Sequence, residues 1–243
     1  MKYPIVFKVH NQRVFGTLHK SKSKSGVIIC HGLARNRCEN LYVSIANYLE
    51  KENFNVLRFD FRGFGESEGK SEFFDHFTEV EDIEASISFL NKKGIRKIGL
   101  VAHSHAAIIS IMAAFQDKRI NTIVCWNGAF RPLKFWSKTE IKEIEKKGYI
   151  YYRGIKFGKR LYQKAREIEP LKYFTKITIP VLLIHSIADK NVPVEESVFT
   201  YSHLKKYTKV KFKKIRTGDH FLTDPKVRKR VFKITADWFK DQL

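Results

Sequence analysis

Three residues of this chain have the types and the order that nucleophilic catalysis by a serine requires. A serine hydroxyl attacks a carbonyl efficiently only when a base accepts its proton and a third group orients that base. Ser104 lies in LVAHSHAAI, between an apolar run and a run of small residues. Asp189 in HSIADKNVP and His220 in TGDHFL could supply the orienting acid and the base. Each also has an ordinary alternative, since Ser is common at helix starts and Asp is common in turns.

The same chemistry needs backbone N–H groups that stabilise the oxyanion formed during attack. The stretch HGLARNR (31–37) follows an apolar run, and the N–H of Leu33 is one candidate donor. The N–H of His105 is the other, because it would open a helix whose dipole favours negative charge. Gly32 would let the backbone approach a substrate closely. We therefore predict an oxyanion hole formed by Leu33 and His105.

These candidate residues all follow runs of strand length. The runs are GVIIC (26–30), KIGLVA (97–102), PVLLIH (180–185) and KVKFKKI (209–215). Open α/β sheets carry their functional groups beyond the carboxyl ends of the strands, where loops from different strands meet. We therefore expect Ser104, Asp189 and His220 to come together at one end of a sheet.

Strand-length runs alternate with segments of helical period along most of the chain. An opening hairpin is predicted from VFKVH and RVFGTLH, further strands over 55–61 and 120–126, and helices over 39–52, 78–93, 105–117 and 194–206. Thr78 and Glu81 have the spacing of a capping box, and Asp224-Pro225 is a favoured start for the last helix. This alternation predicts an α/β fold whose mainly parallel central sheet has helices on both faces.

Five motifs together resemble the α/β-hydrolase superfamily. They are HG (31–32), DFRGFGESEG (60–69), AHSHA (102–106), HSIADKNVPVE (185–195) and GDHF (218–221), and they span nearly the whole chain. The order Ser, Asp, His is the order of the superfamily's catalytic triads. The chain resembles small serine esterases of the cinnamoyl and feruloyl esterase type, and the monoacylglycerol lipase and serine aminopeptidase-like group. The resemblance implies one α/β-hydrolase domain over residues 1–243.

The chain departs from the superfamily pattern at three positions. Ala102 and Ala106 stand where the nucleophile turn G-x-S-x-G has glycines, and Ser186 replaces the usual Gly after His185. Ala is the next smallest residue, so the steric demand of the turn is nearly met. The second Ala could crowd the packing of strand against helix, which would affect turnover more than fold.

Residues 130–170 interrupt the alternation of strands and helices. The segment is rich in aromatic residues and Lys, and contains the charged helical stretch KTEIKEIEKK. Insertions at this end of such sheets commonly form lids or binding walls, and related hydrolases carry a lid here. We predict a lid, and expect Phe130, Trp136 and Phe221 to contact substrate. A surface subdomain without a catalytic role is the alternative.

The composition is typical of a cytoplasmic protein. Three Cys without a CxxC pair argue against a disulfide framework and a zinc site. The N-terminus lacks the basic-then-apolar pattern of a signal peptide, and the longest apolar runs are far too short to span a membrane. We expect no cofactor and no metal, because no Cys or carboxylate completes a ligand set with His31, His103 and His105.

The formal net charge of +21 is the one unusual feature of the composition. Such a charge can indicate nucleic acid, acidic lipid or a charged substrate as partner. The basic residues are spread widely, with local density at KVKFKK and VRKR, and no nucleic-acid-binding motif accompanies them. We predict no nucleic-acid partner; peripheral contact with anionic lipid and formation of a homodimer stay open.

The sequence thus predicts a serine carboxylic-ester hydrolase that forms an acyl-enzyme with short acyl or aromatic, hydroxycinnamoyl-type esters. A small-molecule ester is the expected partner. Activity like that of monoacylglycerol lipases or lysophospholipases, and peptidase or thioesterase activity, stay open because the same three residues serve those reactions. The alternative of another class is a non-catalytic binding protein with a hydrolase fold, which only the two Ala support.

Overall fold

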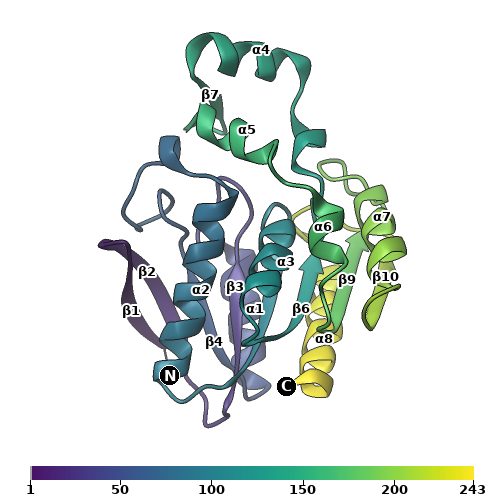
Figure 1. Ribbon diagram of the computed structural model, residues 1–243. Helices are drawn as coiled ribbons and strands as arrows, with labels where there is room; N and C mark the ends of the chain where they lie inside the picture. The colour runs from purple at the N-terminus through teal and green to yellow at the C-terminus, as the bar shows by residue number, and fades with distance from the viewer. Residues whose placement is uncertain (1) are drawn as a thin grey trace.

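The computed structural model describes residues 2–243, and its centre is an eight-stranded sheet (Figure 1). The strands are β1 (Lys2–Val9), β2 (Gln12–His19), β3 (Ser25–Cys30), β4 (Asn55–Phe59), β5 (Lys97–His103), β6 (Ile120–Trp126), β9 (Val181–Ser186) and β10 (Val210–Ile215). They lie in the order β1-β2-β4-β3-β5-β6-β9-β10. β2 pairs antiparallel with β1 and β4, whereas the other pairs of this sheet are parallel. The carboxyl ends of β3, β5, β9 and β10 therefore lie at one end of the sheet.

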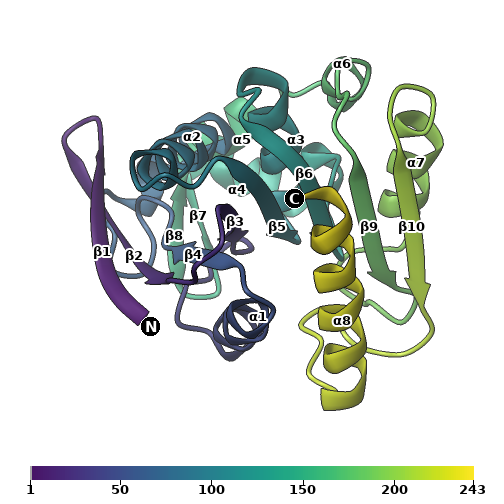
Figure 2. The ribbon, with the colours of Figure 1, turned by 90° about the horizontal axis from the view of Figure 1, so that it is seen from below.

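Helices cover both faces of the sheet, which confirms the predicted fold class. One face is covered by α1 (Asn40–Lys51) and α8 (Pro225–Gln242), and the other by α2 (His76–Lys92), α3 (Ala106–Gln116) and α7 (Glu195–Leu204) (Figure 2). Strands buried on both faces read as continuous apolar runs. In β3, accordingly, Val27 belongs to the apolar cluster of α1 and α8, and Ile28 to that of α2 and α3.

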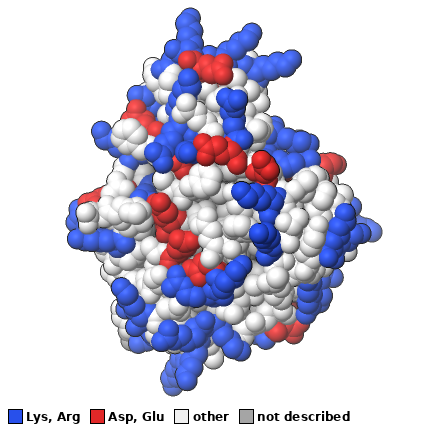
Figure 3. All heavy atoms as spheres, in the orientation of Figure 1, with Lys and Arg blue, Asp and Glu red and all other residues white. Residues whose placement is uncertain are grey.

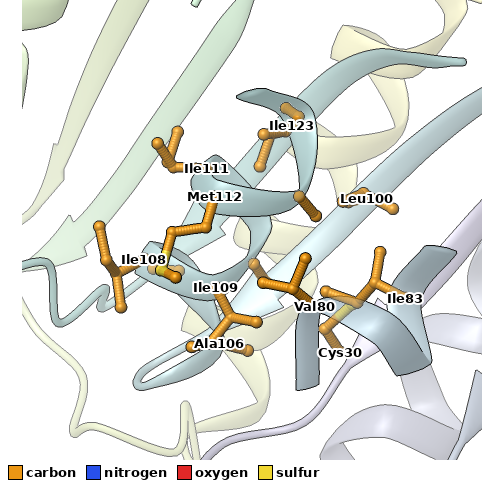
Figure 4. Packing of buried hydrophobic residues seen from close by; sticks show 14 of the residues in the cluster. Cys30, Val80, Ile83, Leu100, Ala106, Ile108, Ile109, Ile111, Met112 and Ile123 are labelled. Carbon is orange, nitrogen blue, oxygen red and sulfur yellow. The ribbon is translucent and has the colours of Figure 1, made fainter. Parts of the chain in front are cut away.

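The core around α3 is closely packed and holds this helix in place. Every residue from Ala106 to Ala114 is buried, as expected of a helix that is apolar on all sides. Figure 4 shows its Ile and Met side chains among residues of α2 and of three neighbouring strands. The residues of α2 and of these strands in the same apolar cluster include Cys30, Val80, Ile83, Leu100 and Ile123. The start of α3, directly after Ser104, is therefore a fixed point of the fold.

The start of α2 differs from the prediction. The helix begins at His76, and Asp75 caps it by accepting hydrogen bonds from the N–H groups of Phe77 and Thr78. The predicted cap, Thr78, is instead the third helical residue and hydrogen-bonds back to Asp75. Glu81 has no capping role and binds Arg62 at 2.6 Å. The predicted box was wrong because a carboxylate three residues earlier accepts from two free N–H groups at once.

Most of the segment between β6 and β9 forms a separate layer beyond the carboxyl ends of the strands, whereas its last helix packs against α3 and α7 (Figure 1). It contains η2 (Pro132–Phe135), α4 (Lys138–Lys147), the hairpin β7 (Tyr149–Tyr152) and β8 (Ile155–Gly158), α5 (Lys159–Ala165) and α6 (Pro170–Phe174). Ser137 and Glu140 form a capping box at the start of α4, and Gly148 ends that helix in the left-handed conformation. Residues 130–170 are called the inserted segment below.

Basic side chains are spread over the visible face rather than gathered in one patch (Figure 3). Several Lys and Arg project from the inserted segment at the top of this view, and acidic side chains form smaller groups between them. Within residues 2–243, no helix combines the length and the apolar character needed to cross a membrane.

Candidate active site

Ser104 lies in a strained turn between β5 and α3. Its φ is +57°, a backbone conformation that residues other than Gly rarely adopt. Its N–H donates to the carbonyl of Trp126 at 3.0 Å, and its own carbonyl accepts from Ala107 at 3.1 Å and from Ala129 at 3.0 Å. Strain of this kind persists only where the surroundings fix it, and it is concentrated at functional sites. The turn lifts the Ser104 hydroxyl beyond the end of the sheet.

The two Ala of this turn are accommodated without disrupting its neighbours. Ala102 and Ala106 are fully buried. Pairing of β5 with β6 continues past Ala102 to His103, and the helix begins at Ala106. A closer approach occurs at Gly32, where an added Cβ would lie 3.2 Å from the Cβ of Ser104. Gly32, in the loop after β3, is therefore a residue that must be small for Ser104 to fit.

The structure brings Ser104, His220 and Asp189 into one hydrogen-bonded chain. His220 Nε2 lies 2.9 Å from Ser104 Oγ, and His220 Nδ1 lies 2.7 Å from Asp189 Oδ2. The other carboxylate oxygen of Asp189 accepts from the N–H groups of Asn191 at 2.8 Å and Val192 at 2.9 Å. This is the geometry in which an imidazole can take a proton from a serine hydroxyl.

The environment of Asp189 keeps its carboxylate ionised. Its side chain is fully buried, and burial alone raises the pKa of a carboxyl group. The hydrogen bond and charge of His220, together with the two backbone N–H donors, outweigh burial and lower the pKa of Asp189 below its usual value. A buried anion facing His220 Nδ1 fixes the tautomer that leaves Nε2 free to accept the proton of Ser104.

Two N–H groups near Ser104 are available for an oxyanion. Leu33 follows Gly32 in the loop after β3, and His105 precedes the first residue of α3. Within residues 2–243, neither N–H donates to another protein group. Both residues line the same cavity as Ser104. Unpaired donors beside a nucleophile are what an oxyanion hole requires.

A buried hydrogen-bond chain joins the loop after β3 to the backbone of His220. The N–H of Gly32 donates to Tyr42 Oη at 3.0 Å, and Tyr42 Oη donates to His103 Nδ1 at 2.9 Å. His103 Nε2 donates to the carbonyl of His220 at 2.8 Å. Burial lowers the pKa of His103 to about 3, so its ring is neutral and has one N–H. The chain therefore fixes the loop that contains Gly32 and Leu33 relative to the backbone of His220.

We expect Tyr42→Phe to lower both stability and turnover. The substitution leaves the Gly32 N–H and His103 Nδ1 buried without a partner, which costs about 1–3 kcal/mol of unfolding free energy. It also removes a contact that fixes His220 relative to the N–H groups of Leu33 and His105, so kcat should fall on the order of tenfold. Urea unfolding and ester hydrolysis measure the two effects. Tyr48→Phe on the same helix is the matched control, and equal behaviour of both variants would contradict the positioning role.

The loop that carries His220 is tied to the sheet by two further polar residues. Asn127 donates to the carbonyl of His220 at 3.0 Å and accepts from the N–H of Ser186 at 2.9 Å. Ser186 Oγ donates to the carbonyl of Gly218. Ser186 thus adds a contact to the loop that carries His220. The sequence offered no signal for the roles of Tyr42, His103 and Asn127, because most of their partners are 59 to 117 residues away.

The stretch DFRGFGES contacts the loop 31–37, which contains Leu33. Asp60 accepts from the N–H of Arg37 at 2.6 Å and forms an ion pair with its guanidinium group. It also accepts from the N–H of Glu66 at 3.0 Å. Gly65 has φ +54°, and an added Cβ would lie 2.3 Å from the carboxyl group of Asp60. The motif therefore acts on the geometry of the site, because it fixes the loop that contains Leu33.

A cavity of about 280 Å³ opens onto Ser104. The strand-end loops form one side, and the inserted segment contributes residues such as Trp136, Ile150, Arg153, Phe157 and Leu161. Trp136 and Phe221, for which substrate contact is predicted, line the cavity. Phe130 does not: its side chain is fully buried and packs in the core against Phe174. That prediction was wrong because an aromatic residue at a strand end can equally turn inward.

The mouth of the cavity carries two guanidinium groups. Arg35 lies over the ring of Phe221 at 4.1 Å from its centroid, and Arg153 at 5.3 Å. Arg35 has only Glu39 as a carboxylate partner, at 3.4 Å. Arg153 has no carboxylate within 4.0 Å among the residues described by the structure. The same residues form no group of three His, Cys, Asp or Glu side chains able to hold a metal ion.

Comparison with known proteins places the fold and the site in context. A model of the family described as "Serine aminopeptidase, S33" matches residues 21–149, which include Leu33 and Ser104. The uncharacterized protein YqkD of Bacillus subtilis is 28% identical over 235 residues, covering 89% of this chain and 71% of its own length. Asp189 and His220 lie beyond the part matched by the family model.

Two solved structures illustrate how widely this fold is shared. Est1E from Butyrivibrio proteoclasticus, solved with ferulic acid bound, superposes with a TM-score of 0.86 at 21% identity over 98% of both chains. The esterase Pf2001 of Pyrococcus furiosus gives a TM-score of 0.79 at 23% identity, over 100% of this chain and 91% of its own. At these identities the likeness shows a common fold.

Proposed function

Because the chain belongs to the serine aminopeptidase S33 family and has an α/β-hydrolase fold, we propose that it is a serine carboxylic-ester hydrolase. The observation that carries the proposal is the chain Ser104–His220–Asp189, whose nucleophile opens into a cavity. Unpaired N–H groups beside that nucleophile support it further. The esterases among the structural relatives are consistent with this reaction class.

Each step of the reaction uses a group already in place. Ser104 Oγ attacks the ester carbonyl carbon while its proton passes to His220 Nε2, and the N–H groups of Leu33 and His105 hold the oxyanion. His220 then gives that proton to the leaving alkoxide, and the acyl group stays on Ser104. Water then attacks the acyl-enzyme while its proton passes to His220; the bond to Ser104 breaks, His220 returns the proton to Ser104 Oγ, and the carboxylic acid is released. Asp189 keeps the imidazolium oriented and stabilised throughout.

The cavity suits a short acyl chain or an aromatic acyl group. Its volume of about 280 Å³ is at the small end of ligand pockets. Trp136, Phe157 and Phe221 offer ring faces and edges to an apolar or aromatic substrate. In this proposal the chain is a single hydrolase domain, and the inserted segment is its lid, which covers the acyl-enzyme.

A fluorophosphonate probe tests the proposal directly. Such probes react only with an activated serine, so we expect stoichiometric labelling of Ser104, identified by mass spectrometry of the labelled peptide. Cleavage of p-nitrophenyl acetate or butyrate should disappear in proportion to labelling. A protein that folds normally but is never labelled at Ser104 would instead be a binding protein with a hydrolase fold.

A second candidate, hydrolysis of an acyl ester in an anionic lipid, is favoured by the mouth of the cavity. Arg35 and Arg153 flank Phe221 there and could bind a phosphate group, and Arg suits phosphate recognition. Salt screens such contacts. Added salt should then slow hydrolysis on anionic vesicles but leave soluble esters unaffected; equal sensitivity would argue against this candidate.

A further inference from the structure

Two imidazole rings lie side by side in the wall of the cavity. His76 is the first residue of α2 and His105 the residue after Ser104, and both line the cavity. Their ring centroids are 4.8 Å apart. The reaction proposed above uses the backbone N–H of His105 but neither side chain. Around them the cavity wall is apolar, with Ile108, Phe157 and Leu161.

The His76 side chain is buried but has no hydrogen-bond partner. It is 2% exposed, and no group within residues 2–243 hydrogen-bonds to either ring nitrogen. Burial, with a further contribution from His105, holds the pKa of His76 well below its usual value, so the ring is neutral. Its Nδ1 is enclosed by protein, which leaves Nε2 to meet the cavity. Buried polar groups without partners are rare in folded proteins.

The His105 ring is fixed by one contact and free at its other nitrogen. Its Nε2 lies 2.8 Å from Glu79 Oε2, and Glu79 is 1% exposed. A carboxylate acceptor assigns the proton of His105 to Nε2, so Nδ1 carries a lone pair. An enclosed lone pair is less costly than an enclosed N–H, which assigns the proton of His76 to Nε2. The cavity wall therefore presents one donor, His76 Nε2, beside one acceptor, His105 Nδ1.

We propose that His76 and His105 bind a hydroxyl group on the acyl part of the substrate, so that the protein prefers short hydroxyacyl esters. The proposal rests on the ester hydrolysis proposed above. A hydroxyl both donates and accepts, so one oxygen satisfies both rings.

The position of the rings places this hydroxyl on the acyl side and near the carbonyl. His220 must protonate the leaving alcohol, and Phe221, whose ring centroid lies 4.9 Å from that of His220, marks the alcohol side. His105 instead contacts Phe74, which packs against Phe157 of the inserted segment. Because His105 directly follows Ser104, a hydroxyl two or three carbons along the acyl chain meets the two rings.

The first test compares matched ethyl esters on the unaltered protein. Ethyl butyrate, ethyl 2-hydroxybutyrate, ethyl 3-hydroxybutyrate and ethyl 3-methoxybutyrate are hydrolysed in a pH-stat, and each kcat/KM is divided by the rate with hydroxide alone. We expect at least one hydroxy ester to exceed ethyl butyrate by about tenfold, as two neutral hydrogen bonds allow. The methoxy ester, which cannot donate, should lose that advantage. Equal values for all four esters would overturn the proposal.

The second test removes the ring nitrogens while keeping a ring. In His76→Phe the ratio of kcat/KM for the favoured hydroxy ester to that for ethyl butyrate should fall about tenfold, mainly through KM. His203→Phe, the same change on α7 outside the cavity, should keep the ratio. A ratio that survives His76→Phe would overturn the proposal, and if that variant does not fold, the ester series alone decides.

The two proposals fail in different ways. Hydrolysis of none of the esters, with no labelling of Ser104, would remove the proposed reaction itself. Hydrolysis of all four at similar corrected rates would keep the reaction and remove only the hydroxyl site. A hydroxy-ester preference that is lost in His76→Phe and kept in His203→Phe would support both.

Discussion

Ser104→Ala is expected to lower kcat for p-nitrophenyl butyrate on the order of 10⁶-fold. Removing the nucleophile of a serine hydrolase abolishes the acyl-enzyme route, and His220 and Asp189 alone cannot replace it. The loss should be in kcat, because the cavity that binds the substrate is unchanged. The rate is measured with purified protein at several substrate concentrations.

The fold of this variant should be intact, so that lost activity reports chemistry. Ala and Ser both carry a Cβ, so the positive φ at position 104 strains them to a similar degree. The three backbone hydrogen bonds of the turn do not involve Oγ. Far-ultraviolet circular dichroism and the melting temperature should therefore match the unaltered protein. Ser44→Ala, on α1, is the matched control and should keep full activity. Substantial hydrolysis by Ser104→Ala would refute the assignment of the nucleophile.

Asp60→Ala is expected to cost about 3–5 kcal/mol of unfolding free energy. The substitution removes the acceptor of three hydrogen bonds and leaves the Arg37 guanidinium group, in a residue only 8% exposed, without its buried partner. Breaking a buried ion pair from one side is costly, and the remaining carboxylate partner of Arg37, Glu66, has a side chain that is 68% exposed. For a chain of this length the melting temperature should fall by about 10 °C. Activity should fall as well, since loop 31–37 loses its clamp.

An exposed ion pair provides the control for this measurement. Lys233 and Asp237 pair at 2.7 Å on the surface of α8, with side chains 68% and 53% exposed. Asp237→Ala should cost less than about 1 kcal/mol. If Asp60→Ala were no more destabilising than Asp237→Ala, the clamping role of the DFRGFGES stretch would be wrong.

The sequence predicted the parts of the site that depend on local patterns. Ser104, Asp189 and His220 follow strands, and strand ends can be read from apolar runs, so the structure does bring these three side chains together. The mainly parallel character of the sheet and the helices on both of its faces followed from the alternation of strand and helix periods.

Other parts of the site depend on contacts that no local pattern contains. The chain Gly32–Tyr42–His103–His220 joins residues from four places in the sequence. Phe130 and Trp136 both come from the aromatic stretch after β6, yet only Trp136 lines the cavity. Which way such a side chain turns is decided by the packing around it, as is the unpartnered state of His76.

The long separations within the triad have a consequence for how activity returns after unfolding. Ser104 and His220 are 116 residues apart, and His220 and Asp189, 31 residues apart, lie in the loops after the last two strands, β10 and β9. Contacts between distant residues form late, because their loops must close first. During renaturation, helical signal should recover before catalysis does, and any kinetic intermediate that lacks β9 and β10 would be catalytically silent. The rate at which hydrolysis reappears would then measure how fast β10, the last strand, joins the sheet.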